Sequence, residues 1–298
     1  MILPGLTRRE ARSGLSLALV FLLSSALAPS ARAQGRPYFV TYDHHLEEPG
    51  SLEVSFNPVL GFPEAGNDFV GGWVEFEYGL NGWWTTEFYL HGQGTRTDSS
   101  VFTGYRWENR FRLLMREHWI NPVLYVEFEN VNGADKSLKE VVGFDSGRDL
   151  TPNAEARREK EREIETKLIL SSNVKGWNIA ENFIAVKNLA GEPWEFGYAL
   201  GAARPLALAA SPNPCTWCPE NFRVGVELYG GLGDWDHFTL SGTSHYLGPV
   251  LAWDLPSGVT IKLSPSFGLT SESHRALIRF GLSYEIHGFG RRLRQMFR

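Results

Sequence analysis

Several features that would define other protein classes are scarce in this chain. Beyond the first 33 residues no apolar run approaches the ~18–20 residues that a membrane-spanning helix needs, so a helical membrane protein is excluded. Only two cysteines occur in 298 residues, and no glycine-rich phosphate loop is present. Positive charge is also in deficit: the formal net charge is −5, which argues against a nucleic-acid partner.

The N-terminus has the three parts of an export signal. Arg8, Arg9 and Arg12 give a positive start, residues 15–27 form a short apolar run, and Ala31-Arg32-Ala33 is a small-residue cleavage site. We therefore predict a signal peptide over residues 1–33 and a mature chain that starts at Gln34, exported from the cytoplasm.

Aromatic residues and glycine are abundant, with 10 Trp, 10 Tyr, 19 Phe and 31 Gly. Apolar and polar residues alternate over segments such as 74–80, 105–113 and 278–286, which is the pattern of strands with two different faces. The pattern predicts an all-β protein of about twelve strands. The predicted strands are 51–57, 70–80, 83–92, 101–115, 121–130, 161–171, 177–187, 193–203, 221–229, 243–253, 258–267 and 275–287; the two at 177–187 and 243–253 alternate too poorly for their faces to be assigned.

Short and long connections between the predicted strands alternate along the chain. Asn81-Gly82 is a tight-hairpin dipeptide, whereas residues 131–160 form a long connection; only the long stretch 204–220 breaks the rule. Short turns at one end and long loops at the other are typical of an outer-membrane barrel, in which apolar residues face lipid and polar ones face the interior. Seven tryptophans near strand ends suggest interfacial girdles: Trp73, Trp83, Trp84, Trp119, Trp177, Trp194 and Trp253.

These patterns predict one closed antiparallel transmembrane β-barrel over residues 51–287. Residues 34–50 are expected to form a periplasmic N-terminal segment, and residues 288–298 a basic periplasmic tail. The expected partners are outer-membrane lipid and the barrel-assembly machinery, with small solutes as cargo and no nucleic acid. The oligomeric state stays open.

Two resemblances support this interpretation. The spacing Arg279-x-Gly281-x-x-Tyr284-x-Ile286 resembles the C-terminal assembly signal of outer-membrane barrels, although a basic tail follows it here. The mature chain also resembles the transporter-like barrels grouped with the MetA-pathway of phenol degradation family, in the segments 75–80, 164–168 and 245–251. This second resemblance implies an outer-membrane transporter.

A row of charged residues is expected to line the lumen. If the alternation is followed through, arginines on one predicted strand lie beside glutamates on the next, close enough for opposite charges to pair. Such pairs either fill a narrow interior or form a constriction that selects solutes. The residues are Glu75, Glu77, Arg106, Glu108, Arg110, Arg112, Glu127 and Glu129.

Two other groups of residues are weaker candidates for a functional site. Cys215 and Cys218 are expected to form a disulfide, since the protein is predicted to be exported. Asp234, Asp236 and His237 lie on a predicted loop and suggest a barrel hydrolase only if a second acidic partner comes from another loop. We therefore predict no enzyme activity, no catalytic residues, no metal and no cofactor.

The leading functional expectation is a narrow passive channel or transporter for small solutes of unknown identity. The alternatives are a non-conducting structural or surface-interaction barrel, an outer-membrane barrel hydrolase, and a secreted β-sandwich that binds carbohydrate through its tryptophans. Alternation alone does not separate a sandwich from a barrel, because only the direction in which the apolar face points differs between them.

Overall fold

The computed structural model describes residues 35–137, 142–144, 150–213 and 215–297. The predicted signal peptide, residues 1–33, lies outside the described residues, as does part of the long connection after residue 132. None of the helices in the described part of the chain is long and apolar enough to cross a membrane.

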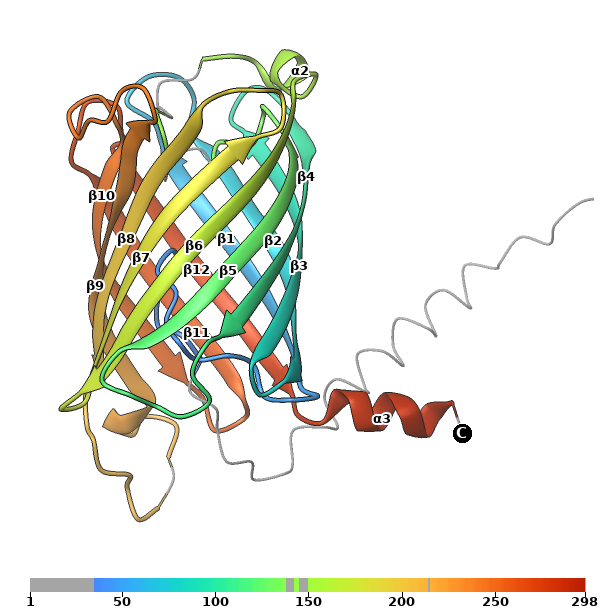
Figure 1. Cartoon of the computed structure of the whole chain (residues 1–298), viewed down its shortest axis with the longest axis vertical. Helices are drawn as coiled ribbons and strands as arrows, with labels where there is room; N and C mark the ends of the chain where they lie inside the picture. The colour runs from blue at the N-terminus through green and yellow to red at the C-terminus, as the bar shows by residue number, and fades with distance from the viewer. Residues whose placement is uncertain (1–34, 138–141, 145–149, 214, 298) are drawn as a thin grey trace, which may run out of the picture.

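Twelve antiparallel strands close into one barrel (Figure 1), as the sequence predicts. Each strand pairs with its neighbours in the chain, and β1 closes the barrel against β12. The secreted-sandwich alternative is therefore wrong. The strands are β1 (Leu52–Phe62), β2 (Phe69–Asn81), β3 (Trp84–Thr95), β4 (Ser100–Arg112), β5 (Asn121–Asn132), β6 (Lys160–Val174), β7 (Trp177–Asn188), β8 (Trp194–Pro205), β9 (Phe222–Asp234), β10 (His245–Asp254), β11 (Val259–Gly268) and β12 (Ala276–Ile286).

The wall is apolar outside and polar inside, because successive side chains of a strand point to opposite faces. In β3, Glu87 and His91 are buried while Phe88 and Leu90 are exposed. Large apolar side chains are exposed on the outer face of every strand, and Trp107 reaches 53% exposure. This arrangement is the reverse of a soluble sandwich, in which the apolar faces pack against each other.

The inward residues of β7 and β10, the two strands with poor alternation, explain why their faces could not be assigned from the sequence. The inward residues of β7 include Ala180 and Ile184, and those of β10 include Val250 and Ala252, all buried. Small or apolar residues therefore face inward as well as outward. No contrast in polarity marks the two faces of these strands.

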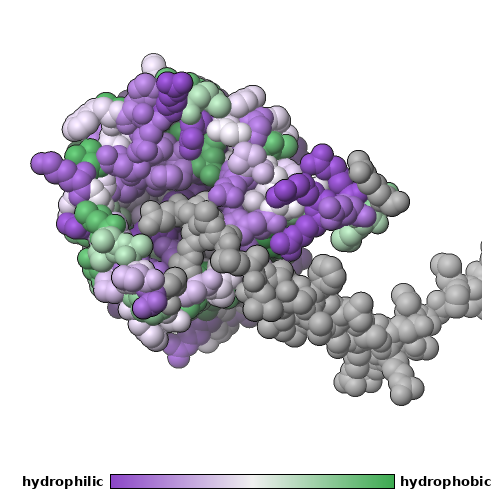
Figure 2. Space-filling model, turned by 90° about the horizontal axis from the view of Figure 1, so that it is seen from below, coloured by the Kyte–Doolittle hydropathy of each residue, from purple (hydrophilic) through white to green (hydrophobic). Residues whose placement is uncertain are grey.

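The two ends of the barrel differ. The short-turn end carries the connections 82–83, 113–120, 175–176, 206–221 and 255–258, and here α3 (Phe289–Met296) follows the last strand. The long-loop end carries the other connections and α2 (Asn153–Ala156), at the top of Figure 1. Figure 2 views the short-turn end, where hydrophilic side chains gather around the barrel mouth and on α3.

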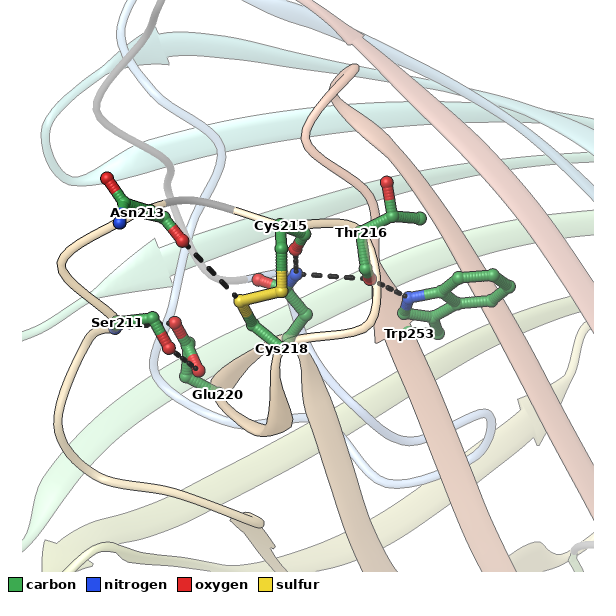
Figure 3. Close-up of a disulfide and its surroundings, with 8 residues drawn as sticks. Ser211, Asn213, Cys215, Thr216, Cys218, Glu220 and Trp253 are labelled. Atoms are coloured by element: carbon green, nitrogen blue, oxygen red, sulfur yellow. Dashed lines mark hydrogen bonds between the residues drawn. A yellow bond between two sulfur atoms is a disulfide. The ribbon is translucent and has the colours of Figure 1, made fainter.

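The long connection at the short-turn end is folded against the wall (Figure 3). Cys215 and Cys218 are joined by a disulfide with an S–S distance of 2.04 Å. Asn221, in the short helix η1 (Pro219–Asn221), donates to the carbonyl of Cys215 at 2.6 Å. Trp253 of β10 donates its indole N–H to the carbonyl of Thr216 at 2.9 Å. The loop is thereby fixed to the barrel rim.

Aromatic residues gather on the outside near the short-turn end. The rings of Trp83 and Trp84 stack at 6.1 Å, and those of Trp217 and Trp253 at 4.4 Å. Trp73 is an exception to the predicted girdle: its ring is buried and its indole N–H donates to Glu75 at 3.3 Å. The girdle assignment of Trp73 is wrong because it shares the inward parity of Glu75 on β2.

Candidate functional site

The barrel interior holds the chain's own N-terminal segment, residues 35–47. Both ends of this segment line a cavity at the short-turn end, and its middle residues reach a second cavity toward the long loops. Residues 37–44 are all buried although they form neither helix nor strand (blue trace within the barrel, Figure 1). The sequence analysis did not anticipate this internal position.

One glutamate holds the middle of the N-terminal segment. The carboxylate of Glu227 on β9 accepts the backbone N–H of Phe39 at 3.1 Å, that of Val40 at 2.9 Å and that of Thr41 at 2.8 Å. Hydrogen bonds to a charged acceptor are stronger than neutral ones. Glu227 is fully buried and thus satisfies three backbone donors that no β pairing serves.

The next residues of the segment are bonded to β6 and β7. Tyr42 and Asn182 exchange two hydrogen bonds, from the Tyr42 N–H at 2.7 Å and from the Asn182 amide at 2.8 Å. The N–H of His44 donates to the hydroxyl of Ser171 at 2.9 Å, and its carbonyl accepts from Arg112 at 2.8 Å. The backbone of the segment is therefore attached to the wall from Phe39 to His44.

Small residues of the wall make room for the segment. Tyr38 packs in a buried cluster with Ala180, Ala203 and Val250 from β7, β8 and β10. A Cβ atom at Gly201 would lie 2.7 Å from the Tyr38 ring. The absence of a side chain at this glycine on β8 is therefore what lets the ring lie against the strand.

The segment also brings a cation to the acidic wall. Arg36 lies 3.4 Å from Glu75 and 4.0 Å from Glu87, and its guanidinium lies 4.0 Å from the ring centroid of Tyr42. Inside a confined interior, unpaired carboxylates are costly. Arg36 therefore contributes to the charge balance of the lumen, although it comes from outside the strands.

Asp43, His44 and His45 form the part of the segment that leads back toward the short-turn end. The imidazole of His45 lies 3.0 Å from the carboxylate of Asp43, which raises the pKa of His45. Burial lowers the pKa of His44, because desolvation disfavours the charged imidazolium. Hydrogen bonds from His44 to Ser171 and from Arg112 to the His44 carbonyl join this part of the segment to the wall.

All eight residues predicted to line the lumen point inward, and seven of them are buried, with Arg112 half-buried. Their pairing differs from the sequence prediction. Arg110 contacts Glu77 on β2 and Glu87 on β3, and its Nε lies 3.0 Å from Glu108 on its own strand. It does not face Glu127 or Glu129: its cross-strand partner on β5 is Tyr125.

Only Arg106 makes the predicted contact with β5. Its guanidinium lies 3.0 Å from Glu127, and it also donates to His91 at 2.8 Å. The β5 residue directly opposite Arg106 is Glu129, which lines the upper cavity. Whether these residues form a constriction for solutes remains a prediction.

Two cavities lie on either side of the N-terminal segment. The larger, of about 710 Å³, opens toward the short-turn end and includes Glu53, Glu77 and Lys262 in its lining. The smaller, of about 210 Å³, lies toward the long loops and includes Glu129, Glu165 and Lys167. Arg36 lines both. We refer to them as the lower and upper cavity.

The hydrolase candidate gains nothing from the structure. Asp234 accepts the backbone N–H groups of Asp236 and His237 at 2.8 and 2.6 Å, a local turn at the long-loop end. Three groups of carboxylates or histidines in the described chain lie close enough to share an ion, and none includes Asp234 or Asp236.

Comparison with known proteins supports the fold. No family model matches the chain, so the resemblance to the MetA-pathway family is not confirmed, and no curated protein matches it. An outer membrane channel from Pseudomonas putida F1 aligns over 82% of this chain and 97% of its own, with a TM-score of 0.53 and 10% identity. The KdgM porin (79% and 99% covered, TM-score 0.44, 7% identity) and the NanC porin (78% and 97%, 0.43, 9%) are weaker matches.

Loosening the Glu227 contacts is expected to free the N-terminal segment. In the variant Thr41→Cys, which introduces the one free thiol of the described chain, a maleimide should react slowly because residue 41 is fully buried. Adding Glu227→Gln should accelerate labelling by about tenfold or more, since hydrogen bonds to a charged group contribute about 1.5–3 kcal/mol. The outward-facing Glu181→Gln is the control, and equal labelling in all three backgrounds contradicts the proposed attachment.

Removing Arg110 should destabilise the barrel. Arg110→Ala leaves three buried carboxylates without their shared cation, which costs about 3–5 kcal/mol in the free energy of unfolding. Arg96→Ala is the control: its pair with Asp68 is exposed, and its loss should cost at most about 1 kcal/mol. Urea titration of the protein refolded in lipid vesicles measures both. A loss for Arg110→Ala no larger than that of the control would show that the pairs contribute little.

Proposed function

We propose that this protein is a passive channel of an outer membrane, which conducts small solutes through a lumen that its N-terminal segment narrows. The observation that carries the proposal is the inverted wall: exposed apolar side chains surround a barrel that encloses ionised ones. A surface of this kind is unfavourable in water and favourable in lipid. The mature protein is then expected to require detergent for extraction.

The dimensions of the interior support a narrow pathway. A barrel of twelve strands encloses less space than the 16–18 strands of water-filled porins. Part of that space holds the N-terminal segment, and the remainder is divided into the lower and upper cavities. Solutes larger than inorganic ions or small metabolites do not fit unless the segment moves.

Placement of the barrel in the membrane follows from its two ends. Short turns and both ends of the barrel chain face the periplasm in outer-membrane barrels, and long loops face outward. We propose the same orientation here, with the lower cavity facing the periplasm. Assembly is proposed to use β12, which carries the Gly281 and Tyr284 spacing of the assembly signal.

A non-conducting barrel is the second candidate, and one observation favours it. Arg106, Arg110 and Lys167 are each paired with glutamates, and the N-terminal segment fills the space between the two cavities. A lumen closed in this way would serve only as a membrane anchor for the long loops. Conductance of the refolded protein separates the two candidates.

Displacing the segment should open the channel. Removal of residues 36–45 is expected to raise single-channel conductance in planar bilayers several-fold, because the lower and upper cavities then join. Gly201→Leu, which intrudes on the Tyr38 ring, should have a smaller effect in the same direction. Removal of residues 289–297 at the exposed C-terminal helix is the control and should leave conductance unchanged. A barrel that conducts nothing in any of these forms would favour the non-conducting candidate.

A charge on the outer face should be poorly tolerated. Phe88→Arg, near the middle of β3, is expected to lower the free energy of unfolding in vesicles by about 2–4 kcal/mol, the cost of an arginine near the bilayer midplane. Phe238→Arg, in an exposed position of the 235–244 loop, should change it by less than about 1 kcal/mol. Equal effects in reversible denaturant titrations would argue against lipid contact at Phe88.

A further inference from the structure

Seven neighbouring strands each place a glutamate at the same level of the β-ladder. Each glutamate is the direct cross-strand partner of the next, so that the row crosses more than half of the wall. We refer to this set as the glutamate row. Its members, in order from β12 through β1 to β6, are Glu285, Glu53, Glu77, Glu87, Glu108, Glu127 and Glu165.

A row of seven adjacent glutamates does not by itself stabilise the fold. Side chains directly opposite each other in neighbouring strands are ~5 Å apart, and like charges in these positions are destabilising. The row ends at β6, because the partner of Glu165 on β7 is Val186. Beyond this point the inward residues are mostly small, such as Ala180 and Ala203. The interior thus has an acidic half and a small-residue half.

The glutamate row leads from one cavity to the other. Glu285, Glu53 and Glu77 line the lower cavity, and Glu165 lines the upper one. Strands in a closed barrel are tilted, so a row perpendicular to them climbs along the barrel axis. The central members of the row are almost completely buried and line neither cavity: Glu87, Glu108 and Glu127.

Fixed cations do not balance the acidic half. Glu75 and Glu129 add to the row, while the cations that lie against it are Arg36, Arg106, Arg110, Lys167 and Lys262. One carboxylate oxygen of Glu127 is buried without a hydrogen-bond partner in the described structure. Carboxylate oxygens of Glu127, Glu129 and Glu165 lie within 4.8 Å of one another. This half of the lumen therefore holds more carboxyl groups than cationic side chains.

The N-terminal segment contacts the middle of the glutamate row through side chains. Its backbone N–H groups from Phe39 to Tyr42 bond to β9 and β7, on the small-residue half. Tyr42 donates its hydroxyl to Glu108 at 2.8 Å, and Arg36 lies 4.0 Å from Glu87. Tyr89 of β3 also donates its hydroxyl to Glu108, at 2.6 Å, and Arg110 contacts Glu87. A passage along the row therefore requires movement of these side chains as well, while the backbone of Phe39 to Tyr42 stays bonded to β9 and β7.

We propose that the glutamate row makes this passage selective for small inorganic cations over anions. The inference rests on the channel function proposed above and names its solute class. Rings or rows of carboxylates raise the local concentration of cations and exclude anions, and a narrow interior strengthens the effect. The positively charged partners keep the row stable and prevent cations from binding too tightly to leave.

Ion selectivity of the refolded full-length mature protein tests the inference. Under a KCl gradient in planar bilayers, the permeability ratio of K⁺ to Cl⁻ should be several-fold above one. Glu165→Gln and Glu285→Gln, at the two ends of the row, should each lower the ratio by about twofold, since each removes one carboxylate from the pathway. Lys167→Gln should raise it, and Glu181→Gln, which faces outward, should not change it.

The outcomes separate this inference from the proposed function. Heat-modifiable gel mobility first confirms that each variant is folded. A channel that conducts with a ratio of one or less, or whose ratio is the same in both end variants as in the wild type, overturns the cation pathway while the channel function stands. Absence of current from the wild type in KCl overturns both.

Discussion

The structure depends on enclosing ionised side chains inside an apolar shell. Most of the inward carboxyl groups are almost completely buried, so cationic side chains nearby stabilise them. The wall supplies Arg106 and Arg110, and the N-terminal segment supplies Arg36. The segment is therefore part of the charge balance of the barrel, and its position inside the lumen is a consequence of the same constraint that organises the strands.

The two halves of the interior complement each other. Long, charged side chains fill the acidic half, and the small residues of β7, β8 and β10 leave a space that the N-terminal segment occupies. Glu227 and Asn182 then satisfy the backbone groups that the segment cannot pair in a sheet. The backbone of Phe39 to Tyr42 is bonded to the small-residue half, whereas the backbone of His44 is bonded to β4 and β6, so the segment joins the two halves.

Much of the wall could be predicted from the sequence, and little of the interior contacts. All eight predicted lumen residues face inward, yet Arg110 reaches Glu77 on β2 and Glu87 on β3 instead of β5. The residues directly opposite it, Thr85 and Tyr125, carry no charge, so its long side chain finds partners that pairing alone does not indicate. The internal segment left one signal: the run Tyr38 to Tyr42 is too apolar for an exposed periplasmic stretch. Periodicity did not detect it, because the segment forms no regular element.

The sequence by itself determined the strands, their number and the alternation of short and long connections, because these depend on the period of two and on local turn residues. Only the tertiary structure decided what lies in the lumen and which charges meet. The glutamate row illustrates the reason: its members are spread from Glu53 to Glu285, and they become neighbours only when twelve strands close in one register. Register and closure are properties of the whole barrel, and no local stretch of residues specifies them.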